Sequence, residues 1–343
     1  MKKIVLTGIC QMEPVEAPVP EIRQPDEVLI RMKAVGVCGS DVHYYDSGKI
    51  GSQVVQYPFA VGHEGAGQIE AVGSGVKRLR PGDRVAIDPA MPCFGCDQCR
   101  AGRFHTCRHM RFLGCPGQAE GCLAEYIVMP ESSCFPISDR LTYEQASVSE
   151  PLAIGVYAVQ LSGVRPGQTI CILGSGPIGM SVLAAARAIG VEQVYVTDKI
   201  PERLALARLS GATWTGDAND PHLTEQMLDT CPQPDFVFEC CGSQDALDSA
   251  IRLLVPGGKL MIIGIPPFSR FSFDVDSMRR KEIAIQNVRR QNGCTGKTIE
   301  LLEQGLIKVD HWITHRFPLE RTQEAFEMVS HYRDGVLKAM IMC

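Results

Sequence analysis

Long apolar segments, an excess of basic residues and internal repeats are all missing from this sequence. No apolar run approaches the roughly 18 residues that a membrane-spanning helix needs. Lys and Arg together number 34 against 39 Asp and Glu, which leaves a formal net charge of -5. This balance creates no basic field that would attract nucleic acid or an anionic membrane. We therefore expect neither nucleic acid nor a membrane among the partners of the protein.

The first residues also lack the features of a secretory signal. The apolar stretch that ends at Leu6 is followed at once by Thr7, Gly8 and Gln11, so it is too short for an export sequence. The chain has 15 cysteines, and those outside one dense cluster stand singly in apolar runs or at scattered positions. Free thiols of this kind are typical of a reducing compartment. The sequence predicts a soluble cytoplasmic protein.

The dense cluster is a C-x2-C-x2-C-x7-C run at about residues 90–110. Four thiolates in so short a polar loop are the ligands of a closed tetrahedral zinc site. An iron–sulfur cluster also takes four thiolates, but the ferredoxin-type run ends in C-x3-C-P, and here the last gap is seven residues. Two disulfides would require an oxidising compartment. We predict a structural zinc lobe whose ligands are Cys93, Cys96, Cys99 and Cys107.

Length and pattern indicate two domains. A chain of 343 residues fits about two domains of ordinary size. Up to about residue 150 it shows short strands, such as 28–35 and 84–87, separated by Gly, Pro and Asp turns. From about residue 151 buried-type strands alternate with helices, which predicts a doubly wound parallel sheet. The expected strands there are 169–173, 193–197, 235–238 and 259–264, and the expected helices are 178–189, 201–209 and 244–254.

A glycine motif at residues 174–179 follows one of these strands and opens a helix. Its glycines allow backbone N–H groups to approach a pyrophosphate at the positive end of the helix. Asp198 lies 24 residues after Gly174, at the end of the next strand, where a carboxylate binds a ribose diol and repels the extra phosphate of NADP. A plain glycine turn beside a solvated Asp is the alternative interpretation. The residues predicted to bind NAD are Gly174, Gly176, Pro177, Ile178, Gly179 and Asp198.

A second possible metal site is dispersed along the chain. Cys38 follows a predicted strand, His63 and Glu64 are adjacent, and Glu150 stands just before Pro151. A catalytic zinc ion needs three protein ligands and an open position, and Cys, His and Glu supply suitable donors. Spacing does not show that they meet, because a lone His or Cys is also an ordinary core residue. Both interpretations remain open on spacing.

Several motifs together resemble one known family. Residues 62–73 carry the pattern G-H-E-x2-G-x5-G, which matches the zinc signature of the medium-chain dehydrogenases/reductases. Residues 38–44, 149–152, 173–179 and 314–319 and the cysteine lobe are most similar to the polyol (sorbitol/xylitol) dehydrogenase branch. The resemblance implies a GroES-like β-rich catalytic domain, residues 1–150 and 289–343, and a Rossmann NAD-binding domain, residues 151–288. It also implies two zinc ions per subunit, one catalytic and one structural.

The resemblance further implies roles for individual residues. Cys38, His63 and Glu64 match the catalytic zinc ligands, whereas Glu150 matches a glutamate that holds the zinc-bound water or joins the metal. Ser40 and His43 match the proton-relay positions, and Asp41 matches a carboxylate behind the ligand His. The positions that border the substrate are Tyr44 and Arg290. Gln291 departs from that branch, which usually has Tyr there, so sorbitol itself is in doubt as the substrate.

We therefore expect an NAD-dependent zinc enzyme that oxidises a secondary hydroxyl of a polyol to a ketone. A threonine-dehydrogenase-like enzyme or a general secondary-alcohol dehydrogenase is the alternative activity. A non-catalytic cofactor-binding protein is disfavoured, because a scaffold has no need of an open metal position. The family resemblance also implies a homotetramer or homodimer.

Overall fold

The computed structural model describes all 343 residues, which form two compact units. Unit 1 comprises Met1–Glu150 and Thr295–Cys343, and unit 2 comprises Pro151–Cys294. In this division the chain returns to unit 1 at Thr295. Cys294, the last residue before Thr295, is bonded within unit 2, since its thiol donates to Gln160 Oε1 at 3.4 Å.

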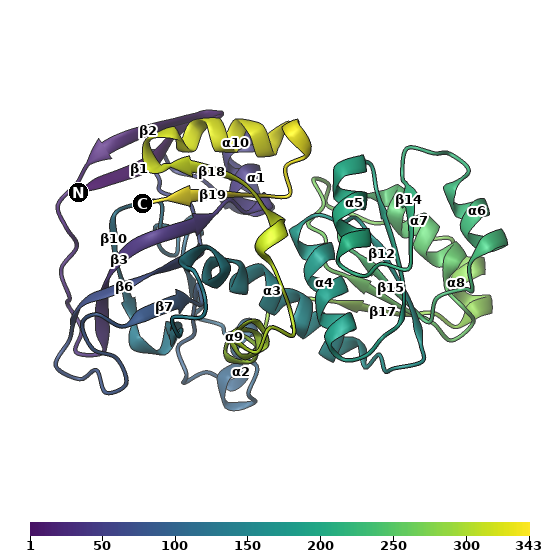
Figure 1. The fold of residues 1–343 in the computed structure, drawn as a ribbon, viewed down its shortest axis with the longest axis horizontal. Coiled ribbons are helices and arrows are strands. Elements are labelled where there is room, and N and C mark those ends of the chain that lie inside the picture. The colour runs from purple at the N-terminus through teal and green to yellow at the C-terminus, as the bar shows by residue number, and fades with distance from the viewer. The chain divides into compact units, whose positions relative to one another are not determined.

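Unit 1 is built around a mixed seven-stranded sheet in the order β11-β7-β6-β3-β19-β18, with β10 paired to β3. The two ends of the chain meet in it, since the C-terminal β18, β19 and α10 (yellow) lie with the early strands (purple) in Figure 1. Its elements are β1 (Lys2–Gly8), β2 (Gln11–Glu16), β3 (Glu27–Gly36), α1 (Gly39–Ser47), β4 (Lys49–Ile50), β5 (Gln53–Val54), β6 (Glu64–Val72), β7 (Arg84–Ile87), β8 (Ala90–Met91), α2 (Asp97–Arg100), β9 (Arg111–Phe112), β10 (Tyr126–Pro130), β11 (Cys134–Pro136), α9 (Thr295–Glu303), β18 (Ile313–Pro318), α10 (Thr322–Ser330) and β19 (Lys338–Met342).

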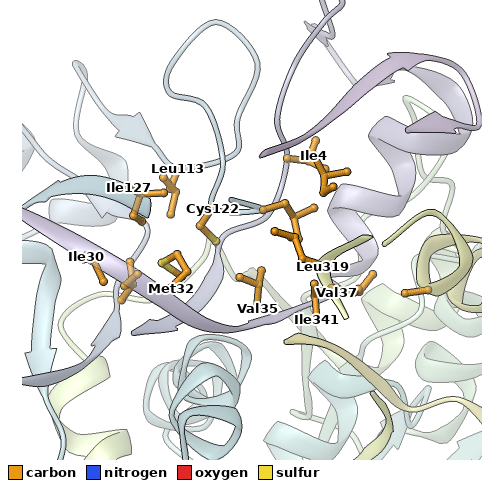
Figure 2. Close-up of a cluster of buried hydrophobic side chains, with 14 of the residues drawn as sticks. Ile4, Ile30, Met32, Val35, Val37, Leu113, Cys122, Ile127, Leu319 and Ile341 are labelled. Atoms are coloured by element: carbon orange, nitrogen blue, oxygen red, sulfur yellow. The ribbon is translucent and has the colours of Figure 1, made fainter. Parts of the chain in front are cut away.

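The core of unit 1 joins segments that are distant in sequence. Ile30, Met32 and Val35 of β3 belong to one buried cluster that also contains Cys122 and Ile341 of β19, as Figure 2 shows. These β3 residues are fully buried. Burial of this apolar surface is the main force that holds the sheet together. It also anchors the end of β3, the start of β6 and the start of β19, where the candidate site is assembled.

Unit 2 contains a six-stranded parallel sheet in the order β14-β13-β12-β15-β16-β17. This order, with the reversal between β12 and β15, is that of the doubly wound dinucleotide-binding fold. The central strands are apolar and buried on both faces, as parallel strands between helices are. The elements are β12 (Thr169–Leu173), α4 (Pro177–Ala188), β13 (Gln193–Asp198), α5 (Pro201–Leu209), β14 (Trp214–Asp217), α6 (Leu223–Thr230), β15 (Phe236–Glu239), α7 (Gln244–Leu253), β16 (Lys259–Ile262), α8 (Val275–Lys281) and β17 (Ala284–Asn287).

The predicted alternation of strands and helices in unit 2 is confirmed, but one long helix was missed. Helix α3 (Tyr143–Ser162) runs through Pro151, which had indicated only a change of pattern. Proline normally interrupts a helix because it lacks the N–H and crowds the preceding turn. Here the surrounding helical residues are almost all buried, so packing outweighs the local preference.

No helix in the protein combines the length and apolar character that crossing a bilayer requires.

Candidate active site

The four cysteines of the lobe come together around one point. Their sulfur atoms all lie within 4.8 Å of one another, with the Sγ of Cys96 3.6 Å from that of Cys99 and the Sγ of Cys107 3.5 Å from that of Cys93. Zn–S bonds of about 2.3 Å in a tetrahedron place sulfur atoms about 3.8 Å apart. None of the cysteines forms a disulfide. The sulfur cage therefore has the dimensions that a zinc ion requires.

Backbone groups of the lobe favour the thiolate form of one of its cysteines, Cys96. Hydrogen bonds from the backbone of Arg108 and of Cys99 lower the pKa of Cys96 to about 6. The thiolate is the form that binds metal, so this cysteine is a ready ligand at neutral pH. On the exposed side of the lobe, Asp97 accepts two hydrogen bonds from the Arg108 guanidinium, at 2.5 and 2.8 Å, which link the two ends of the cysteine loop.

Around His63, side chains from two elements of unit 1 converge. Cys38 directly precedes helix α1, and Asp41 lies in the first turn of that helix. His63, which directly precedes β6, donates from Nδ1 to Asp41 Oδ1 at 3.2 Å. Because this bond occupies Nδ1, the other ring nitrogen, Nε2, is the one that remains for a metal.

The electrostatic surroundings of His63 favour a positive charge. Burial lowers the pKa of His63, but the Asp41 carboxylate and the Cys38 side chain outweigh burial and raise that pKa well above its usual value. The imidazole is buried, so these neighbours are poorly screened by water. A pocket that stabilises a cation on its histidine is also suited to a metal ion.

Glu150, like Asp41, has a buried carboxylate oxygen without a hydrogen-bond partner. It lies on α3, it is buried, and its Oε2 has no hydrogen-bond partner. Burial raises the pKa of Glu150 to about 7, although the nearby His63 acts in the opposite direction. A buried carboxylate oxygen without a partner is costly in free energy. A metal ion, or a water bound to one, would satisfy it.

Glu64, one of the expected zinc ligands, is paired with a buried lysine. Both of its carboxylate oxygens accept from Lys338 Nζ, at 2.8 and 2.6 Å, and the pair is buried. The carboxylate lies over Gly36, where a Cβ would sit 2.1 Å from Glu64 Oε2. Strand pairing causes this placement, because β3 runs between β6 and β19 and brings Glu64 near Lys338. Unlike the two oxygens of Glu64, the Oε2 of Glu150 has no hydrogen-bond partner in the structure.

Lys338 was missed in the sequence, although a signal was present. It stands within the apolar run 336–341, where a lysine has no reason to be buried unless it has an anionic partner. Its ammonium also donates to the backbone oxygen of Val37 at 3.1 Å. Ser147 was missed as well; its hydroxyl bridges Gly36 N and the backbone oxygen of Glu64 and so ties α3 to both strands.

The two expected proton-relay residues share one face of α1. Ser40 and His43 are three positions apart, which places their side chains on neighbouring turns. The Ser40 hydroxyl donates to Cys38 Sγ at 3.3 Å, and it therefore lies beside the expected metal ligand. Burial lowers the pKa of His43, which favours the neutral imidazole that accepts a proton.

The glycine motif of unit 2 has the geometry of a phosphate-binding loop. It joins β12 to α4, and Pro177 occupies the first position of the helix. A Cβ on Gly179 would meet the carbonyl oxygen of Gly174 at 1.8 Å, so only glycine permits the helix to pack this closely. Gly176, in contrast, has free space around it, because the nearest atom that a Cβ there would meet is Arg203 Nη1 at 3.6 Å. The loop is open at the position where a pyrophosphate binds.

Asp198 ends β13 beside this loop. Its carboxylate accepts from Ser175 N at 2.6 Å and from Ile200 N at 3.0 Å. Each carboxylate oxygen retains a further lone pair for a ribose hydroxyl. Arg203 of α5 was not singled out in the sequence, yet it is a buried cation next to the loop. The donors and acceptors here fit a dinucleotide.

Comparisons with known proteins agree with this geometry. The alcohol dehydrogenase GroES-like domain matches residues 24–139, and the zinc-binding dehydrogenase domain matches residues 177–304. The sequence is 38% identical over 343 residues to the sorbitol dehydrogenase of Bacillus subtilis (strain 168), with 99% of this chain and 97% of that one covered. This chain belongs to the zinc-dependent medium-chain dehydrogenases.

Solved structures of similar proteins extend the comparison. An Escherichia coli oxidoreductase/dehydrogenase of unknown specificity has a TM-score of 0.93 and 33% identity, with 99% of this chain and 98% of that chain covered. An alcohol dehydrogenase from Escherichia coli CFT073, solved with NADH, has a TM-score of 0.92 and 28% identity, with 100% and 99% covered. The expected fold class, a GroES-like domain with a Rossmann domain, is confirmed.

The residues expected to border the substrate of this medium-chain dehydrogenase lie in different units. Tyr44 is buried on α1 of unit 1. Arg290 follows β17 in unit 2 and has a backbone φ of +53°, a conformation that non-glycine residues rarely adopt. Gln291 accepts a hydrogen bond from Cys294 N through its Oε1 at 2.7 Å, which helps to shape the loop. The strained backbone of Arg290 is of a kind that is often retained at functional sites.

Proposed function

We propose that this dehydrogenase oxidises a secondary hydroxyl of a polyol to a ketone and transfers the hydride to NAD. The observation that carries the proposal is the buried His63, held by Asp41, with Cys38 beside it and the unpartnered Glu150 oxygen nearby. The similarity to the Bacillus subtilis sorbitol dehydrogenase supports the substrate class.

Cys38, His63 and Glu150 would hold the catalytic zinc ion, with Glu150 bound directly or through a water. Glu64 would remain on Lys338 and join the metal only if that ion pair opened. The sulfur, nitrogen and oxygen donors fit zinc. When bound, zinc lowers the pKa of a coordinated hydroxyl, and the nicotinamide of NAD accepts hydride. Cys93, Cys96, Cys99 and Cys107 would hold a second, structural zinc ion.

The chain itself supplies orientation and proton transfer. Asp41 fixes the His63 ring through Nδ1, which keeps Nε2 directed to one position. Ser40 Oγ, against Cys38 Sγ, and the neutral His43 imidazole would carry the hydroxyl proton away from the site. In unit 2 Asp198 would bind the ribose diol and disfavour NADP, while Arg203 would balance phosphate charge and Arg290 would bind the substrate.

The same chain is proposed to be a cytoplasmic homotetramer or homodimer. Its 15 unpaired cysteines support a reducing compartment. Strand β17 is an edge of its sheet, and Ile265, Phe268 and Val275 in the preceding segment are exposed apolar residues. An exposed edge strand with apolar neighbours supports association with a second copy.

The proposal is tested by NADH formation with a panel of polyols, threonine and alcohols with a single hydroxyl, with and without a chelator. We expect polyols to give the highest kcat/KM and chelation to abolish turnover. His63→Ala should reduce kcat by about a thousandfold, the order of a lost metal contribution of several kcal/mol, and should leave folding and NADH binding intact. The exposed His222→Ala is the matched control. Threonine as the best substrate would support the alternative activity, and turnover by a protein with zinc only in the cysteine lobe would refute the proposed mechanism.

A further inference from the structure

Three polar side chains from separate parts of unit 1 form one cluster. Tyr44 Oη donates to Gln53 Oε1 at 3.1 Å, and Gln53 Nε2 donates to Cys115 Sγ at 2.8 Å. Tyr44 Oη also lies 3.9 Å from Cys115 Sγ. Tyr44 and Cys115 are buried, whereas Gln53, at the start of β5, is partly exposed. Two buried groups therefore hold the amide of Gln53, whose side chain is partly exposed at the surface of the unit.

The chain segments that carry this cluster adjoin those that carry the candidate catalytic residues. Tyr44 follows His43 on α1, the helix that begins directly after Cys38. On the other side, the Phe112 ring is 5.5 Å from the His63 ring. A Cβ on Gly114 would lie 2.8 Å from the carbonyl oxygen of Gly62, so the backbone that leads to Cys115 touches the backbone that leads to His63. Gln53 is thus bonded to two residues, Tyr44 and Cys115, that belong to the chain segments which also build the candidate site.

The chemistry of the cluster suits a neutral hydroxyl group. A glutamine amide has two N–H donors and a carbonyl with two lone pairs. One N–H is used on Cys115 Sγ and one lone pair on Tyr44. Gln53 thus retains both a donor and an acceptor, which is what a hydroxyl needs. None of these three side chains carries a formal charge that would offset the desolvation of a phosphate or carboxylate.

We propose that Gln53, held in place by Tyr44 and Cys115, binds a second, non-reacting hydroxyl of the substrate. It thereby makes the enzyme selective for diols and polyols over alcohols with one hydroxyl. This inference rests on the proposed function and assigns part of its specificity to one side chain. The competing explanation is that the cluster only fastens the β4–β5 hairpin to α1.

The test compares kcat/KM for sorbitol or another accepted polyol with kcat/KM for butan-2-ol. Gln53→Leu keeps the approximate size of the side chain and removes both polar groups. We expect the ratio of the two kcat/KM values to fall about tenfold, the effect of one neutral hydrogen bond, through a raised KM for the polyol. Gln68→Leu is the matched control, since Gln68 is a half-buried glutamine that donates only to Gly82 O at 3.0 Å. It should leave the ratio unchanged.

A second pair of variants separates positioning from packing. Cys115→Ser keeps an acceptor for the Gln53 amide and should preserve most of the polyol preference, whereas Cys115→Ala should lower it. An equal fall of kcat/KM for both substrates in Gln53→Leu would show a structural role and overturn the inference. If Gln53→Leu still oxidises polyols and the ratio of the two kcat/KM values is unchanged, this inference is overturned and the proposed function stands. A wild-type enzyme that oxidises butan-2-ol but no polyol would refute the proposed function and this inference together.

Discussion

At the scale of single residues, one buried ion pair decides how the carboxylates of the site are used. Lys338 and Glu64 are 2% and 1% exposed, and the ammonium binds both carboxylate oxygens. A buried pair of this kind adds little net stability compared with apolar residues, but losing one partner leaves an uncompensated charge. The pair therefore holds Glu64 in place, whereas Glu150 keeps an oxygen without a hydrogen-bond partner.

Lys338→Met should accordingly lower the free energy of unfolding by about 3–5 kcal/mol, because Glu64 loses its only cationic partner among these contacts. Urea unfolding measures the change. The double variant Glu64→Gln with Lys338→Met should recover most of the loss, since it removes both charges. A single variant that loses less than about 1 kcal/mol would show that Glu64 is neutral or solvated in the folded protein.

At the scale of elements, the cysteine lobe depends on its metal more than on apolar packing. Helix α2 has only four residues, and the exposed Phe94 and Phe104 rings contact each other at 5.5 Å without covering a core. A helix this short has no stability of its own. We propose that the lobe folds when its four thiolates bind one metal ion, so that metal binding and local folding are coupled.

Cys96→Ser should therefore reduce the zinc content from two ions per subunit to one and open the lobe. The physical reason is that a hydroxyl replaces the thiolate with the lowered pKa. Metal analysis measures the loss of zinc, and limited trypsin digestion at Arg100 and Arg103, both exposed, measures the opening. Cys231→Ser, a partly exposed thiol of unit 2, is the control and should keep both ions. Retention of two ions by Cys96→Ser would argue against the tetrahedral sulfur site.

At the scale of the whole molecule, each unit contributes a separate binding function. Unit 1 carries the candidate metal ligands, and unit 2 carries the glycine loop and Asp198. The cofactor should therefore stabilise the protein even when the metal site is damaged, because a ligand that binds only the folded state adds to its stability.

NADH at about 100 times its dissociation constant should stabilise the fold by about 2.7 kcal/mol, both in the wild type and in His63→Ala. NADPH at the same concentration should stabilise it less, because the Asp198 carboxylate repels the additional phosphate. Asp198→Ala should reduce the difference between the stabilisation by NADH and that by NADPH, as measured by thermal unfolding across a titration of each cofactor. An equal difference in wild type and variant would show that Asp198 does not bind the ribose.

Much of the fold and part of the site follow from short stretches of sequence. The strand–glycine loop–helix pattern at 169–188 and the acid at Asp198 were predicted, and the structure forms them. Helix α3 was not predicted, because its stability comes from burial that overrides Pro151. Strands β14 and β17 were also missed, because they are four-residue edge strands with little apolar pattern.

The sequence by itself determined the features whose parts lie within one loop or in adjacent elements. The cysteine lobe is of this kind, since its four ligands span only 15 residues and their spacing already encodes the cage. Tertiary structure alone decided which carboxylate stays available at the site. Lys338 and Glu64 are 274 positions apart, and Cys115 and Gln53 are 62 apart. Local pattern cannot report such pairs, because a buried polar group selects its partner only when strand pairing and core packing bring the two together.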